Sequence, residues 1–168
     1  MHICLFLRCK DGTENVSSID NLDLSTFEKK EGLVAEIVNF SLFDKDGNER
    51  YEYELEEYVR IQIVYDVYEE SLKNPVLGVA VMRDDNTYIC GVNTLLDGVQ
   101  IPWKYGRNVF NLEYSSGARA VGGNYYFDAA IFDETATVQI QYVKNIKQFK
   151  ICSGYKGEGL YIIPHVWR

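Results

Sequence analysis

Residues 74–94, NPVLGVAVMRDDNTYICGVNT, form the most informative stretch of the chain. An apolar run comes first, the polar residues Asp84-Asp85-Asn86 follow, and a second apolar run begins at Tyr88. Turn formers between two apolar runs are typical of a β-hairpin. The second run ends in Gly-Val-Asn-Thr, a sequence that a buried strand does not require. The stretch therefore predicts two β-strands joined by a tight polar turn.

Alternation of apolar and polar residues continues on both sides of this hairpin. Over residues 59–68 the alternation is clearest and indicates one buried face. No convincing long amphipathic helix separates the runs. Short strands at regular spacing predict an all-β fold, an antiparallel β-sandwich of the immunoglobulin-like or jelly-roll kind. Further strands are expected at residues 34–42, 51–55, 109–114, 122–133, 138–142, 149–152 and 160–163.

The chain is expected to hold one main domain. Its 168 residues are close to the usual size of a domain with a single core. Residues 1–31 lack the alternation that follows and are predicted to be a linker or N-terminal arm. Residues 32–168 are predicted to form the β-sandwich.

Charge and composition exclude several function classes. A formal net charge of −8 disfavours nucleic acid and anionic membrane surfaces, which are bound by clustered Lys and Arg. The apolar start of the chain lacks a basic region before it, so an intracellular protein is expected. Four cysteines, Cys4, Cys9, Cys90 and Cys152, form no Cys-x-x-Cys pair, and the chain has two histidines. No metal site and no cofactor are therefore predicted.

Catalytic motifs are absent from the sequence. It has no phosphate-binding Gly-x-x-x-x-Gly-Lys-Ser/Thr loop, no Gly-x-Ser-x-Gly elbow and no His-Glu-x-x-His. A glycosidase needs only two suitably spaced carboxyl groups, and this alternative stays open. The acids that could supply such a pair are Asp97, Glu113, Asp128 and Asp133.

Flat rings and short polar side chains are abundant in the strands and in the loop before residue 106. Aromatic residues make up 14% of the chain, including 13 Tyr. Sugars stack their C–H faces on such rings, while amides and carboxylates bond their hydroxyls. Asn108 and Asn111 are of the same chemical type. The residues predicted to bind carbohydrate are Tyr88, Asn93, Trp103, Tyr105, Asn124, Tyr126 and Asp128.

Three motifs in order resemble the C-terminal carbohydrate-binding domain of Wzt-type ATP-binding subunits from O-antigen polysaccharide ABC transporters. They are Asn-Pro-Val-Leu-Gly at residues 74–78 with Gly-Val-Asn-Thr at 91–94, Gly-Asn-Tyr-Tyr at 123–126, and Gly-Glu-Gly-Leu-Tyr-Ile-Ile-Pro-His-Val-Trp at 157–167. The resemblance covers residues 33–168. The full-length subunit carries a phosphate-binding loop that this sequence lacks, so the ATPase domain is absent from the chain.

The resemblance implies a non-catalytic domain that recognises the non-reducing end of a lipid-linked O-antigen polysaccharide and selects it for export. Its implied location is cytoplasmic, at the inner face of the inner membrane, with the ATPase and permease parts of an ABC exporter as partners. It also implies a homodimer in which a C-terminal strand, residues 160–167, exchanges between protomers. The net negative charge favours a largely neutral sugar. Two alternatives stay open: a glycoside-processing enzyme with a carboxylate pair, and a purely structural dimerisation module.

Overall fold

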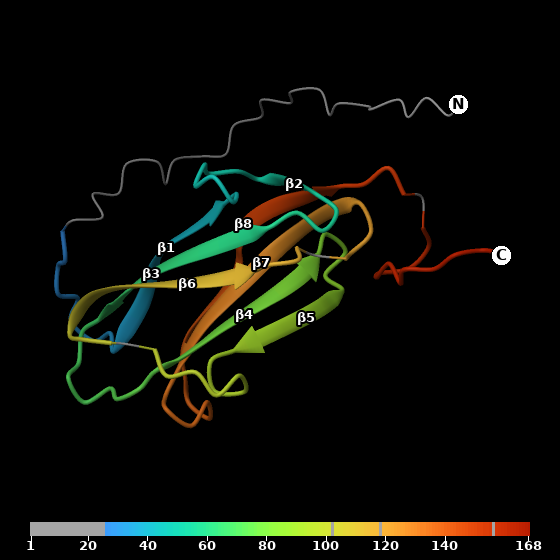
Figure 1. The fold of residues 1–168 in the computed structure, drawn as a ribbon. Coiled ribbons are helices and arrows are strands. Elements are labelled where there is room, and N and C mark those ends of the chain that lie inside the picture. Colours follow the sequence, from blue (N-terminus) through green and yellow to red (C-terminus); the bar gives the residue numbers. More distant parts are fainter. Residues whose placement is uncertain (1–25, 102, 118, 156) are drawn as a thin grey trace.

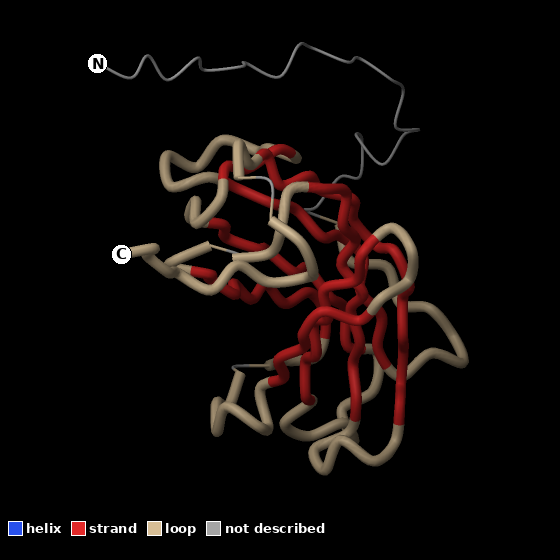
Figure 2. Tube along the Cα trace, turned by 90° about the vertical axis from the view of Figure 1, so that its right-hand side faces the viewer, coloured by secondary structure: helices blue, strands red, loops and turns tan. Residues whose placement is uncertain are grey.

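Eight strands form the regular structure of the described part of the chain (Figure 1). The computed structural model describes residues 26–101, 103–117, 119–155 and 157–168. These residues contain no helix that could cross a membrane, and every regular element in Figure 2 is a strand. The strands are β1 (Ala35–Phe43), β2 (Glu52–Glu54), β3 (Val59–Val67), β4 (Val76–Arg83), β5 (Tyr88–Asn93), β6 (Gly106–Tyr114), β7 (Gly123–Phe132) and β8 (Gln139–Cys152).

The strands build two sheets that face each other. The three-stranded sheet has the order β1-β3-β6, and the five-stranded sheet has the order β2-β8-β7-β4-β5. All pairs are antiparallel except β2 with β8, which is parallel. Because the sheets bury apolar side chains between them, the predicted all-β sandwich is confirmed.

The core lies between the inner faces of the two sheets. The three-stranded sheet contributes Phe40, Ile61 and Ile63, each at most 3% exposed. On the opposite sheet, the Phe127 and Phe149 rings stack with centroids 4.5 Å apart. Alternation along each strand therefore places one apolar face inward, as the sequence pattern predicts.

The hairpin predicted over residues 74–94 is confirmed as β4 and β5. Its turn is closed by the Arg83 N–H, which donates to the Thr87 carbonyl at 2.9 Å. Asn86 takes the positive φ of 66° that this turn needs. Asparagine tolerates that backbone region better than most residues, so the polar turn residues have a direct structural role.

Two strand predictions are wrong in detail. Residues 138–142 and 149–152 belong to one long strand, β8, rather than to two. The strand predicted at residues 51–55 is present as β2, which crosses to the other sheet after β1 and pairs with the end of β8. Residues 160–163 form no strand, because only Tyr161 makes a bridge, with Ala120.

The outer face of the three-stranded sheet is more buried than alternation predicts. Asp66 and Tyr68 lie on the expected polar face of β3, yet they are 1% and 2% exposed. The Arg107 guanidinium donates two bonds of 2.7 Å to the Asp66 carboxylate. The Tyr68 ring stacks on Phe27, with centroids 5.6 Å apart. Charge pairing and an aromatic contact therefore bury this part of the face.

Phe27 belongs to the predicted arm, residues 1–31. Residues 1–25 of that arm, with Cys4, Cys9 and His2, lie outside the described residues. The described end of the arm contacts the sandwich through Phe27, and through Lys30, which pairs with Glu36. Cys90 is a free thiol.

Candidate functional site

The outer face of the five-stranded sheet gathers most of the predicted binding residues. Side chains of residues paired across neighbouring strands point to the same face of a sheet. Ala80 pairs with Gly91 and Asp128, and Met82 pairs with Tyr88 and Tyr126. Gly78 pairs with Asn93 and Ala130 in the next row. Since Leu77, Val79 and Val81 fill the core, the residues paired with Gly78, Ala80 and Met82 lie on the outer face.

Three tyrosines surround small residues on this face, and we call this surface the tyrosine platform. Tyr88, from β5, is 60% exposed, and Tyr142, from β8, is 41% exposed. Tyr126, from β7, is partly exposed. The small residues between them are Gly78, Ala80 and Gly91. Tyrosine rings that project beyond small residues offer flat apolar faces and hydroxyl groups, both of which suit a sugar.

Gly91 allows the Tyr88 ring to lie over its own strand. A Cβ atom at Gly91 would lie 2.2 Å from the Tyr88 hydroxyl oxygen. Any larger residue would therefore push the ring away from the sheet. The position of one platform ring depends on this glycine.

Asn93 and Thr94 end the hairpin instead of simply facing solvent. The Asn93 Oδ1 atom accepts the Leu96 N–H at 2.8 Å and so caps the turn that follows β5. The Thr94 Oγ1 atom accepts the Leu77 N–H at 3.2 Å, while the Thr94 N–H donates to the Leu77 carbonyl at 3.0 Å. These bonds explain why β5 ends at Asn93, with Thr94 directly after it.

Asn124 is exposed at the other end of the platform, beside the β4–β5 turn. Its backbone carbonyl accepts the Asp84 N–H at 3.2 Å. The predicted residues that share the outer face are thus Tyr88, Asn93, Asn124, Tyr126 and Asp128.

Trp103 and Tyr105 do not join the platform. Trp103 packs against the core, with the Lys73 Nζ atom 5.7 Å from its ring centroid. Tyr105 contacts Phe27 edge to face, with centroids 5.4 Å apart, beside the three-stranded sheet. Their loop is fastened by Asn108, whose side chain bonds the backbone of Lys104 and Gly106.

Tyr142 is the platform residue that the sequence did not reveal. Alternation grouped it with Val138 and Ile140 on one face of a strand. The β7–β8 pairing shifts register between Ile131 and Phe132, so Ile140 packs on the core whereas Tyr142 pairs with Ala130 on the outer face. An irregular strand pairing leaves no local sequence signal.

The four candidate acids of a glycosidase pair lie in separate places, and one of them, Asp97, lines the small cavity between the sheets. Asp128 accepts bonds from Tyr142 and Asn145 on the outer face of the five-stranded sheet. Glu113 lies on β6 of the other sheet, opposite Arg60 of β3 in the strand register. Asp133 caps the β7–β8 turn, and hydrogen bonding from the Val138 N–H, above other causes, lowers the pKa of its carboxyl. A general acid needs a raised pKa, so Asp133 does not suit that role.

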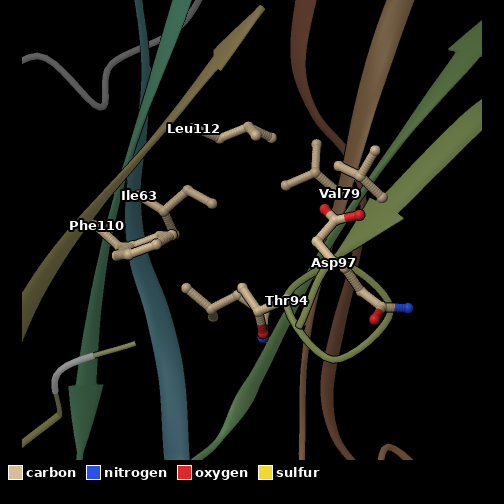
Figure 3. A pocket seen from close by; sticks show the side chains of 9 residues that line it. Ile63, Val79, Thr94, Asp97, Phe110 and Leu112 are labelled. Carbon is tan, nitrogen blue, oxygen red and sulfur yellow. The ribbon is translucent and has the colours of Figure 1, made fainter. Parts of the chain in front are cut away.

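A small cavity of about 30 Å³ lies between the sheets near the β5 edge (Figure 3). Ile63, Phe110 and Leu112 point into it from one sheet, opposite Val79 and Thr94. Its remaining lining residues are Leu77, Val92, Asn93 and Asp97. Such a volume holds about one or two water molecules and cannot hold a pyranose ring. The platform is therefore the better candidate site.

One comparison with known proteins identifies a family for this chain. A family model described as the Wzt C-terminal domain matches residues 29–163. The crystal structure of the C-terminal domain of wzt has a TM-score of 0.70 and 13% identity, and the match covers 90% of this chain and 99% of that chain. At this identity the structural likeness shows the fold alone. The family match confirms the resemblance that the sequence predicted.

Other comparisons add little. The soluble domain of PmoD from Methylocystis sp. matches with a TM-score of 0.34 and 15% identity, covering 73% of this chain and 100% of that chain. A β-glucosidase from Listeria innocua matches with a TM-score of 0.38 and 11% identity, covering 70% of this chain and 16% of that chain. Both TM-scores are too low to bear on the fold. No curated protein matches the chain.

Proposed function

The chain belongs to the Wzt C-terminal domain family, and on that premise we propose that it is a non-catalytic carbohydrate-binding domain. Its ligand is the non-reducing end of a lipid-linked O-antigen polysaccharide, which it selects for export by an ABC transporter. Binding takes place without making or breaking a bond in the sugar.

The observation that carries this proposal is the tyrosine platform. Rings from three different strands stand around glycine and alanine on an exposed sheet face. A sugar can stack its C–H face on one of these rings. The tyrosine hydroxyls and the Asn124 amide, on the same face of the sheet, can form hydrogen bonds with the hydroxyl groups of that sugar. Shallow, wet contacts of this kind give weak binding at each site.

The proposed partners and location follow from the family. The domain acts beside the ATPase and permease parts of an exporter, at the cytoplasmic face of the inner membrane. A net charge of −8 supports a largely neutral polysaccharide over a strongly anionic one.

The C-terminal segment supports a homodimer built by strand exchange. Large apolar side chains there face solvent: Ile163 is 72% exposed, Val166 78% and Trp167 91%. Apolar groups clustered in this way commonly mark an association surface. Two linked sites would raise the effective affinity for one glycan. Removal of residues 160–168 is expected to yield a monomer in size-exclusion chromatography with light scattering, and a dimer that persists would contradict the exchange.

Binding to the polysaccharide tests the proposed function. The probe is the delipidated O-polysaccharide of the organism that makes the chain, titrated into the intact protein by calorimetry. We expect saturable binding without release of sugar fragments. Tyr126→Ala should weaken it about twofold to tenfold, because a stacked ring contributes about 0.5–1.5 kcal/mol beyond its buried area.

Tyr105→Ala is the matched control. Tyr105 is 40% exposed, almost the same as Tyr142, but it contacts Phe27 rather than the platform. Its removal should leave the affinity unchanged. The absence of binding to the polysaccharide would refute the proposal, and sugar fragments in the mixture would instead favour a glycoside-processing enzyme.

A further inference from the structure

In the middle of the platform, a segment of β8 contains two more residues than the segment of β7 that it faces. Tyr126 and Ala130, four residues apart on β7, pair with Gln148 and Tyr142, which are six residues apart on β8. Asp128 lies opposite this excess. A bulge of this kind bends the strand and redirects nearby side chains.

The Asp128 carboxylate holds the bulge in place. Its Oδ1 atom accepts the Asn145 N–H at 2.7 Å, and its Oδ2 atom accepts the Tyr142 hydroxyl at 2.8 Å. Asn145 takes a positive φ of 51°, and Asp128 is only 4% exposed. Both carboxylate oxygens are therefore engaged within the protein, below the exposed surface.

This arrangement fixes which hydrogen bond Tyr142 can offer to a ligand. A tyrosine hydroxyl has one proton and two acceptor lone pairs, whereas a carboxylate can only accept. Since the Tyr142 proton is donated to Asp128, the exposed side of its oxygen can only accept.

We infer that Tyr142 is a ligand-binding residue of the platform, that Asp128 positions it, and that the pair selects a sugar with a free hydroxyl group that donates to the Tyr142 oxygen. The inference deepens the proposed function and rests on it. Asp128, predicted as a binding residue from the sequence, acts through Tyr142 instead of touching the sugar. A sugar whose hydroxyl at that point is O-methylated cannot donate this bond.

Substitutions at the two positions change this hydrogen bond in different ways. Asp128→Asn keeps the shape, but its amide nitrogen can donate to Tyr142 and release the tyrosine proton toward the ligand. Tyr142→Phe keeps the ring and removes the hydroxyl, and Tyr142→Ala removes both. The three variants thus separate ring stacking from the direction of the hydrogen bond.

Affinity for native and O-methylated polysaccharide tests the inference. Both probes come from the delipidated O-polysaccharide of the organism that makes the chain. Tyr142→Ala should bind the native form about tenfold more weakly than the unmodified protein does. The preference of the unmodified protein for native over O-methylated polysaccharide should shrink several-fold in Asp128→Asn and in Tyr142→Phe, because both lose the acceptor-only oxygen.

A second readout needs no ligand. Burial, and then the bond to the Asp128 carboxylate, raise the pKa of Tyr142 to about 12. In Asp128→Asn this pKa should fall toward the ordinary value of 10.0, as followed by NMR of ring-labelled tyrosine, with Tyr142→Phe identifying the signal. A merely structural Asp128 would leave the selectivity between the two polysaccharides unchanged.

The outcomes distinguish the two proposals. If Tyr126→Ala weakens binding while Tyr142→Ala does not, the platform binds sugar without Tyr142 and this inference is wrong. An unchanged Tyr142 pKa in Asp128→Asn would also overturn the positioning role. If the unmodified protein binds neither polysaccharide, the proposed function itself fails. Should Asp128→Asn not fold, Tyr142→Phe alone decides whether selectivity depends on the hydroxyl.

Discussion

The outer faces of the two sheets differ in how far their aromatic rings are covered. On the three-stranded sheet the Asp66 carboxylate is held by Arg107, and the Tyr68 hydroxyl donates to Glu36 at 2.6 Å. Phe27 covers part of that face. On the five-stranded sheet, Tyr88 and Tyr142 stay exposed beside glycine and alanine. Both faces satisfy their buried carboxylates internally, since Asp128 accepts bonds from Tyr142 and Asn145, but only the five-stranded face keeps tyrosine rings exposed.

The difference indicates that the three-stranded face contributes more to folding stability and that the platform is the better candidate for ligand binding. A buried charge pair is costly to break because the remaining charge loses its partner. An exposed ring contributes little to folding, since most of its surface stays in water. We therefore expect substitutions on the three-stranded face to change unfolding and substitutions on the platform to change binding.

The largest expected effect is the loss of the buried pair. Asp66→Ala leaves the Arg107 guanidinium, whose side chain is 16% exposed, without its bidentate partner. The free energy of unfolding should fall by about 3–5 kcal/mol in urea denaturation. A double change, Asp66→Leu with Arg107→Met, removes both charges and should recover much of that loss. A single variant as stable as the unmodified protein would contradict the assignment of stability to this face.

A smaller effect is expected from the aromatic contact at the arm. Phe27→Ala removes a ring that stacks on Tyr68 and touches Tyr105. Because Phe27 is only half-buried, the loss should be about 1–2 kcal/mol, below that of a core phenylalanine. Thermal unfolding measures it, with Phe27→Tyr as the control. Polysaccharide affinity should stay the same, and a marked drop would show that the two faces are coupled.

The smallest expected effect is a loss of folding stability at low pH. Hydrogen bonds, first from the backbone of Asn48 to Asp44 and of Val138 to Asp133, lower the pKa of both turn carboxyls below 3.8. A lowered folded-state pKa means that the stabilisation is complete above the unfolded value and disappears as pH falls through the folded value. Stability should therefore decline below about pH 4. Asp133→Asn should make stability decline less steeply with falling pH, because the neutral side chain cannot be protonated. Urea midpoints measured between about pH 2 and 6 follow this change, since stabilisation by such a carboxyl disappears between about pH 5 and 1. An unchanged slope would remove Asp133 from the explanation.

Much of the fold was predictable because local rules act within each strand. The hairpin at residues 74–94 and the strands β1, β3, β6 and β7 follow period-two alternation and turn chemistry. These signals depend on neighbours in the sequence. They identify strands without saying which sheet a strand joins, so the crossing of β2 to β8 had no local signal.

The site was predictable only in part for the same reason. Tyr88, Asn124 and Tyr126 follow from strand parity once β4, β5 and β7 are adjacent. Trp103 and Tyr105 lie on a loop without periodicity, so the sequence does not predict which way their side chains point. Tyr142 was missed because register shifts in β8 break the alternation that a reader of the sequence must assume.

The bonds at Asn93 and Thr94 have a consequence for how such domains diversify. The Asn-Pro-Val-Leu-Gly and Gly-Val-Asn-Thr segments fasten β4 to β5 at one end of the hairpin. These two segments connect the strands of the hairpin and are separate from the rings of Tyr88, Tyr126 and Tyr142. Under the proposed function, new sugar preferences can therefore arise by exchanging those rings while these segments stay unchanged, and a match to the segments alone does not tell which sugar is bound.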